Sequence, residues 1–326
     1  MAAIFSKNSG LNDDFWKDDA RALAQVIDDT ANEKGQYDEL VSAIYNEKTS
    51  KKYAEKTAGL TALGNMTPTS EGDNFALDSI QEAEPKLIVH STFTTGFACT
   101  QEMKEDGEIE VMKAAARNLA LSYKRTRAQI ASDALTCAAS SYVFGGKTFD
   151  ATTGDGVALF STSHAGSQSN VYTNDFGNNS TMLNRLANIG RNFKNASGHV
   201  QGYTFDTIII PSNCPALEDT IKRIIRSDLV VGSNNNDVNT QKGLWNLIVN
   251  PCWQVASGNP YIIMSKEANK ALLAAMFYDR VPLTIRNDIN KDNWNLEWTA
   301  RARFTPGFRD FRAFIMGGAA AGTTLS

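Results

Sequence analysis

The hydrophobic pattern is clearest between residues 104 and 141, where apolar side chains recur at steps of three, four or seven. Such steps place side chains on one face of an α-helix. No proline interrupts the range, so the helix would measure roughly 50 Å at about 1.5 Å per residue. We therefore predict a spine helix across an elongated molecule; the alanine-rich stripe suits a coiled coil less well. The stripe residues are Ile109, Met112, Leu119, Tyr123 and Ile130.

A period of two marks the C-terminal part of the chain. Apolar residues alternate with polar ones from 294 to 304, which predicts a long strand with one buried face. A Pro-Gly turn at 306–307 should let residues 311–316 return as its partner strand. The expected core of this sheet is Trp294, Leu296, Trp298, Phe304 and Phe314.

Residues 67–103 contain two extended stretches, 75–80 and 87–97, with Glu82, Glu84 and Pro85 between them. This arrangement predicts a β-ribbon. A lone two-stranded ribbon is marginal in water, so a projecting ribbon needs a partner surface. The apolar residues that we expect a neighbouring subunit to cover are Phe75, Leu77, Ile80, Leu87, Val89 and Phe93.

The remaining segments predict a mixed α+β protein. Residues 1–66 read as helical, including a lysine-rich helix face at 48–56, and 182–193 as a further helix. Residues 205–280 alternate strand and helix, with Asn213 capping one helix and Ser265 capping another over 266–277.

Composition and charge restrict the function. The chain is 42% hydrophobic and 21% charged, typical of a folded protein, and its net charge of −4 argues against a large nucleic-acid groove. This charge permits weak contact with DNA. No apolar run is long enough to span a membrane, residues 1–10 lack the apolar core of a secretory signal, and cysteines 99, 137, 214 and 252 lack zinc-site spacing.

Two stretches resemble catalytic motifs, but each lacks a glycine that its motif requires. His164 follows Ser161 and Ser163, but no glycine precedes the serines as a G-x-S-x-G elbow requires. The Gly-Gly-Lys-Thr run at 145–148 lacks the first glycine of a P-loop, because position 141 is serine, so it reads as a turn. We expect no catalytic, cofactor-binding or metal-binding residue, and a loop histidine bonded to backbone at 164.

The order of these elements resembles the tailed-bacteriophage major capsid proteins, with the Hong Kong 97-type fold that encapsulin compartments share. The resemblance covers roughly residues 67–318. It rests on the ribbon, the long helix, and the runs IIIPS at 208–212, GLWNLIVNP at 243–251 and RAFIMGG at 312–318. The runs LFSTSH at 159–164 and TQEM at 100–103 look like parts of Mu-type head subunits.

The resemblance implies a layout of five parts. These are an N-terminal arm with helices (1–66), an extended loop (67–103), a peripheral domain with the spine helix (104–204), an axial domain (205–280) and C-terminal strands of the peripheral domain (281–326). It implies pentamers and hexamers that form an icosahedral shell around double-stranded DNA, a virion component assembled in the bacterial cytoplasm. Portal, scaffold or decoration proteins are implied partners, and no cofactor is. An encapsulin-like compartment, a Ser/His hydrolase and a minor head or decoration protein are the alternatives.

Overall fold

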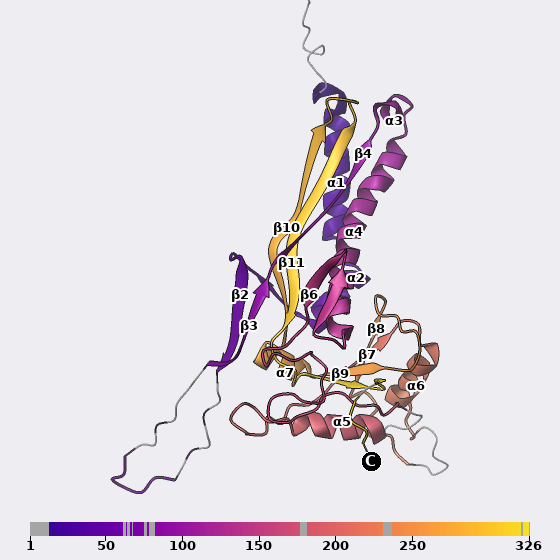
Figure 1. The fold of residues 1–326 in the computed structure, drawn as a ribbon. Coiled ribbons are helices and arrows are strands. Elements are labelled where there is room, and N and C mark those ends of the chain that lie inside the picture. The colour runs from indigo at the N-terminus through magenta and orange to yellow at the C-terminus, as the bar shows by residue number, and fades with distance from the viewer. Residues whose placement is uncertain are drawn as a thin grey trace, which may run out of the picture.

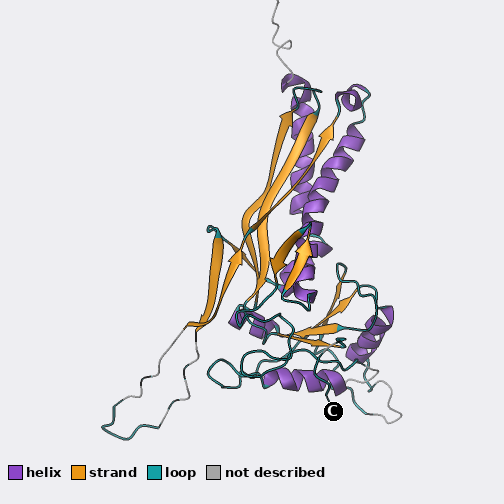
Figure 2. Cartoon of the chain, in the orientation of Figure 1, coloured by secondary structure: helices purple, strands orange, loops and turns teal. Residues whose placement is uncertain are grey.

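The computed structural model describes residues 13–60, 63, 66, 68–74, 77, 82–176, 181–230, 237–320 and 322–325. It is an α+β protein with a long upper part, a compact lower part and a ribbon that projects from their junction (Figures 1 and 2). The predicted fold class is confirmed.

A four-stranded sheet, in the order β1-β10-β11-β4, forms the long upper part (Figure 1). Its strands are β1 (Asn46–Thr49), β10 (Ala275–Ile289), β11 (Leu296–Phe308) and β4 (Ser91–Cys99). Helices α1 (Asp13–Asn32) and α4 (Ile109–Thr136) cover one face of this long sheet. The alternation of apolar and polar residues in β11 arises because one face of the strand is buried, as predicted. Leu296, Trp298 and Ala300 are buried against these helices. Thr299 and Arg301 face away from them.

A second sheet, in the order β12-β9-β7-β8, lies at the centre of the lower part (Figure 1). Its strands are β7 (Thr207–Pro211), β8 (Asn246–Asn250), β9 (Tyr261–Met264) and β12 (Phe314–Gly317). Helices α5 (Thr181–Arg191), α6 (Pro215–Arg226) and α7 (Lys266–Leu272) belong to the same part. Strands β7, β9 and β12 are buried along their whole length, which explains their uninterrupted apolar runs.

Two hairpins and two short helices complete the chain. The ribbon is β2 (Ala54–Leu60) with β3 (Glu82–Val89), and a smaller hairpin is β5 (Ser141–Phe144) with β6 (Lys147–Asp150). Gly145 and Gly146 make its turn with positive φ, as expected for a glycine turn. Helices α2 (Gln36–Ile44) and α3 (Gln101–Glu105) flank the ends of the long sheet.

The spine helix is shorter than predicted. Gly107, with φ near +76°, separates α3 from α4, and the backbone turns extended at Cys137. Met112, Leu119 and Ile130 are buried and Tyr123 is partly buried, as the stripe predicted. Ile109 is exposed instead, because it is the first residue of α4.

The predicted pairing of the C-terminal strands was wrong. Strand β11 pairs with β10 and β4, whereas Phe314, buried as expected, belongs to β12 of the second sheet. Trp294 is 51% exposed with φ near +57°, since it lies in the turn between β10 and β11 and not in a strand. Leu296, Trp298 and Phe304 are buried as predicted.

Several local predictions also need correction. The lysine-rich segment 48–56 forms the end of β1 and the start of β2, not a helix. Helix α7 ends at Leu272, because Leu273 adopts a left-handed conformation and β10 begins at Ala275. Ser265 caps α7 as predicted, but Asn213 caps no helix and bonds Val255 instead.

Helix α1, in the segment predicted as an arm with helices, packs within the body of its own chain. Leu23 and Ile27 of α1 are buried against α4 and β11 of the same chain, so α1 is an integral layer of the fold. Residues 1–12, which the arm hypothesis also includes, lie outside the described residues. Among the described residues, no helix has the length and apolarity that crossing a bilayer requires.

Candidate assembly surfaces

The ribbon of β2 and β3 has one face held against the body and one face free. Ile88 is 4% exposed and packs with Met276 and Tyr278 of β10. A side chain at position 307 would clash with Ile88, so Gly307 makes room for this contact. The adjacent Leu87 is 61% exposed, and Val89 is exposed beside it. The free face therefore presents two of the predicted assembly residues to solvent.

Charged groups fix the root of the ribbon, which is the part where Glu84, Lys86 and Ile88 contact the body. Lys86 contacts Asp150 and Thr152 on the β6 side, and Arg309 donates to the Ala58 carbonyl of β2 at 3.3 Å. Burial would raise the pKa of Asp150, but hydrogen bonds from Lys86 and Thr152 outweigh it and hold that pKa below its ordinary value. The carboxylate is thus kept ionised opposite the lysine.

A second ion pair ties the root to the stretch before β12. Arg312 is buried and lies 3.3 Å from Glu84 and 2.9 Å from Asp310. Glu84 itself has a positive φ of 48°, and its carbonyl approaches so near Gly154 that a Cβ there would lie 2.4 Å away. The sequence prediction missed this root, since residues so far apart give no local signal.

Residues 68–74, in the loop between β2 and β3, lie away from the body (Figure 1). Leu77 is 96% exposed and does not lie in a strand, contrary to the prediction, while Phe75 and Ile80 lie outside the described residues. Leu63 and Met66, which the prediction missed, are exposed too. Large apolar side chains in solvent mark a surface that another molecule can cover.

Phe93 was wrongly assigned to the ribbon. It belongs to β4, stacks on Phe304 with ring centroids 4.5 Å apart, and packs against Phe149 and Phe144. The reason is that the chain leaves the ribbon at His90, so the extended stretch 87–97 is two strands in two different sheets. Phe93 is therefore partly buried against the core of its own chain.

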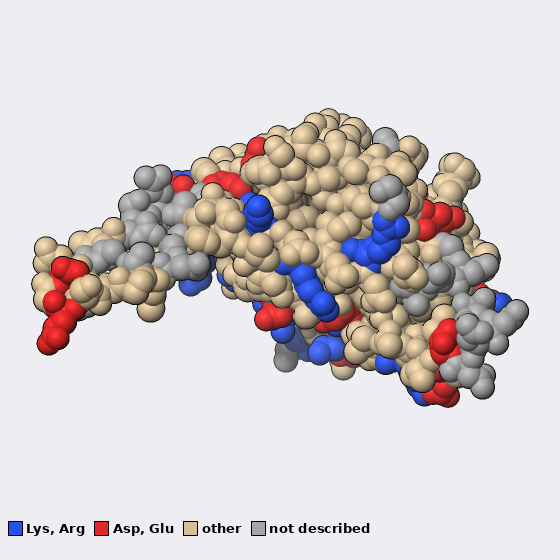
Figure 3. Space-filling view, turned by 90° about the horizontal axis from the view of Figure 1, so that it is seen from below, with Lys and Arg blue, Asp and Glu red and all other residues tan. Residues whose placement is uncertain are grey.

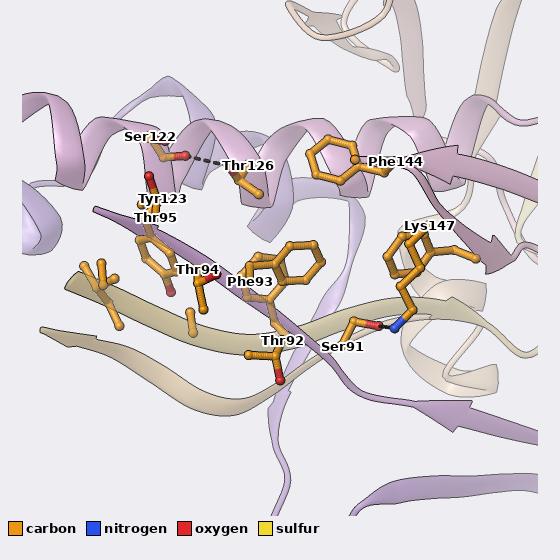
Figure 4. Close-up of a pocket in the computed structure, with 16 residues that line it drawn as sticks. Ser91, Thr92, Phe93, Thr94, Thr95, Ser122, Tyr123, Thr126, Phe144 and Lys147 are labelled. Atoms are coloured by element: carbon orange, nitrogen blue, oxygen red, sulfur yellow. Dashed lines mark hydrogen bonds between the residues drawn. The ribbon is translucent and has the colours of Figure 1, made fainter. Parts of the chain in front are cut away.

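A cavity of about 470 Å³ lies between β4, α4 and the β5–β6 hairpin (Figure 4). Phe93, Tyr123 and Phe144 line it, and Lys147 donates to Ser91 at its edge over 3.1 Å. Burial raises the pKa of Tyr123. A protonated phenol and a lysine already bonded to a serine give no base or nucleophile, so this cavity is not suited to catalysis.

A third exposed apolar group lies beyond the end of α6. Leu229 and Val238 form an isolated β-bridge, and both are exposed together with Leu244. Figure 1 places this end of the lower part on the side opposite the ribbon. The group falls in the range predicted to meet its copies at the symmetry axes, and that role stays a prediction.

His164 has a structural role. Its Nδ1 lies 2.8 Å from Asp155, its Nε2 lies 3.2 Å from the Leu159 carbonyl and 3.1 Å from Asn170, and its ring stacks on Phe311. The sequence predicted that His164 bonds the backbone, but it did not predict the buried Asp155 carboxylate as a partner. Both ring nitrogens already have partners and neither bonds a serine hydroxyl, so no Ser-His pair forms here.

Metal and disulfide chemistry find no support in the described part of the chain. No cluster of three or more His, Cys, Asp or Glu side chains occurs among those residues. All four cysteines are free thiols, and burial raises the pKa of each. They are poor nucleophiles and poor metal ligands in this state.

Comparisons with known proteins agree with this architecture. A family model described as phage capsid protein matches residues 82–317. No curated protein matches the sequence.

Solved capsid structures share the fold at low sequence identity. The capsid of an empty GTA particle is 11% identical, with 89% of this chain and 92% of that chain covered and a TM-score of 0.56. A chain from Mycobacterium phage Patience is 12% identical, with coverages of 98% and 91% and a TM-score of 0.54. The capsid of Myoviridae phage XM1 is 12% identical, with coverages of 84% and 88% and a TM-score of 0.51. These matches do not single out the Mu-type head subunits, so that closer resemblance stays a prediction.

Proposed function

This chain belongs to the phage capsid protein family, and from that premise we propose that its copies form the pentamers and hexamers of an icosahedral shell around phage double-stranded DNA. It is a structural component of the virion and not an enzyme. We infer that it is the major subunit of that shell and that assembly takes place in the host cytoplasm.

The projecting ribbon is the observation that carries the proposal. Its root is fixed by Ile88, Lys86 and Glu84, while Leu87 and Leu77 remain in water. A two-stranded ribbon with this much exposed apolar surface is poorly suited to a solitary protein. A rigid root with an uncovered outer part is suited to a segment that a neighbouring copy covers.

Many modest contacts of this kind can produce a stable shell. Each subunit would use the ribbon, the exposed group around Leu229 and Val238, and further surfaces at once, and linked contacts reinforce one another. Head-to-tail contacts between identical copies close into rings when the rotation between them permits. Portal, scaffold or decoration proteins, and weak non-specific contact with DNA, complete the proposed set of partners.

Shortening the loop tests the proposal without damaging the fold. Leu60 pairs with Glu82 across the ribbon, so an Asn-Gly turn can replace residues 61–81 and close a short hairpin. A larger deletion that reached into 91–99 would remove β4 from the long sheet and unfold the protein. Wild-type protein should sediment as closed particles, and the short-hairpin variant as small oligomers or monomers.

Two readouts separate assembly from folding. Circular dichroism and the melting temperature of unassembled subunits should match between the wild type and the short-hairpin variant, because the residues that fix the root are retained and assembly no longer contributes to stability. Electron microscopy then reports particles. Normal particles from the short-hairpin variant would refute the assigned role of the ribbon.

A further inference from the structure

Four arginines lie on or beside the uncovered face of the long sheet. Arg301 and Arg303 lie on β11, and Arg280 and Arg286 on β10. Arg127, Arg223 and Arg312, by contrast, each have a carboxylate partner. Within the described residues none of these four forms an ion pair, and the Nε atoms of Arg280 and Arg303 are buried without an acceptor. Unpaired guanidinium groups on one face favour an anionic ligand.

Two of these arginines line a groove of about 490 Å³. Arg301 lies opposite Thr284 of β10 and Thr94 of β4, and Arg286 lies opposite Thr299. Arg286 and Arg301 are therefore diagonal neighbours on one face, close enough to hold the same ligand. Gly96 and the threonines give the groove a flat floor with hydroxyl groups, which suits an extended peptide segment.

Arg303 and Arg280 also act on His90, where β3 meets β4. Burial and then Arg303 lower the pKa of His90, Glu55 opposes them, and Arg280 adds a smaller lowering. Farther from the root, the next pair on this face after Arg286 and Thr299 is Asp288 across from Glu297. These carboxylates repel any anion that extends past Arg286, so the groove is better suited to a short acidic segment that ends there than to a continuous track of DNA.

The chain itself carries such a segment. Glu71 and Asp73 are exposed in the loop between β2 and β3, and neither forms an ion pair within the described chain. Figure 3 shows the acidic side chains gathered at the far end of the projecting segment. The exposed Met66 and Leu77 lie in the same loop and add apolar surface.

Docking must join two different copies. In Figure 1 the described residues 68–74 lie below the root, whereas the long sheet rises above it, so this part of the loop lies away from the groove of its own chain. We propose that Glu71 and Asp73 of one copy dock against Arg286 and Arg301 of a neighbouring copy. This inference rests on the proposed function and names the surface that the extended loop covers.

Reciprocal charge reversal tests this contact. One variant carries Glu71→Arg and Asp73→Arg, a second carries Arg286→Glu and Arg301→Glu, and a third carries all four changes. All four side chains are exposed, so each variant should fold. Each two-site variant should lower the particle yield by about tenfold or more, and the four-site variant should restore it to within about threefold of wild type.

The matched control is Arg117→Glu with Arg125→Glu. These two exposed arginines lie on α4, on the other side of the long sheet, and their reversal changes the net charge by the same amount as the Arg286 and Arg301 pair. The control should assemble normally.

Four results would overturn the inference: normal yield from both two-site variants, no recovery in the four-site variant, an equal loss in the control, or normal particles that lose only DNA after arginine reversal. The last result would assign the groove to nucleic acid. A wild-type chain that forms no particles would instead overturn the proposed function, and this inference with it.

Discussion

The guanidinium of Arg312 lies 3.3 Å from the carboxylate of Glu84, although the two residues are 228 positions apart in the chain. Arg312 precedes β12 of the second sheet, and Glu84 belongs to β3 of the ribbon. The pair therefore sets the direction of the ribbon relative to the lower part. Arg312 is buried, so removing one member of the pair would leave the other as an uncompensated buried charge and would lower the free energy of unfolding.

We expect Arg312→Met to destabilise the fold by about 3–5 kcal/mol, since it leaves the Glu84 and Asp310 carboxylates without their cation. Urea unfolding measures this change. Arg223→Met is the control, because Arg223 pairs with Asp219 on an exposed helix face and should cost less than about 1 kcal/mol. Equal effects from the two variants would show that Arg312 is not a structural anchor.

Substitutions at two adjacent residues of β3 should separate an effect on stability from an effect on assembly. Ile88→Ala removes a buried side chain and should cost about 2–4 kcal/mol, while Leu87→Ala should change stability by less than about 0.5 kcal/mol. Particle yield should nevertheless fall in Leu87→Ala, because its side chain is on the free face. Thermal melts and sedimentation measure the two effects. A Leu87→Ala variant with unchanged yield would mean that this face stays uncovered in the particle.

Asp155 should control stability in acid. Burial would raise the pKa of Asp155, but hydrogen bonds from His164 and Thr153 lower it to about 2, from an ordinary value of 3.8. As pH falls, the Asp155 carboxylate is protonated in the unfolded chain at a higher pH than in the folded protein. The stabilisation from Asp155 is therefore complete above about pH 4 and is lost as pH falls toward 2. Asp155→Asn should cost about 2 kcal/mol at pH 7 and flatten this acid dependence. Exposed Asp292→Asn, the control, should do neither.

His90 should make the ribbon root sensitive to mild acid. Burial, Arg303 and Arg280 lower its pKa below the ordinary 6.5, so the folded protein binds the proton less readily than the unfolded chain. Stability from this group is therefore present above pH 6.5 and decreases as pH falls below it. Hydrogen exchange of the β2 and β3 amides should quicken from pH 7 to 5 after correction for the intrinsic rate. The His90→Gln variant should lose this dependence, and an unchanged profile would exclude His90 as its source.

Periodicity predicted the elements whose burial follows a simple geometric rule. Met112, Leu119 and Ile130 repeat at helical spacing because α4 buries one stripe, and Leu296 and Trp298 alternate because β11 buries one face. Such patterns depend only on local geometry. They could be predicted from the chain alone.

The failures arise where tertiary contacts override the pattern. The sequence of β2 has no apolar alternation from which a strand could be predicted. Its Lys56 is exposed, and its Glu55 accepts a hydrogen bond from Ser50. Phe93 and Phe314 have the expected apolar surroundings but belong to strands whose partners are far away in sequence. The ion pairs of Arg312 and the unpaired arginines of the long sheet are likewise invisible without the fold.

The most direct test of the account is electron microscopy of the purified wild-type chain after expression in bacterial cells. The account predicts closed shells in which the loop between β2 and β3 of each copy lies on a neighbouring copy. A monodisperse 35.6 kDa monomer at every concentration, with that loop folded onto its own body, would contradict it.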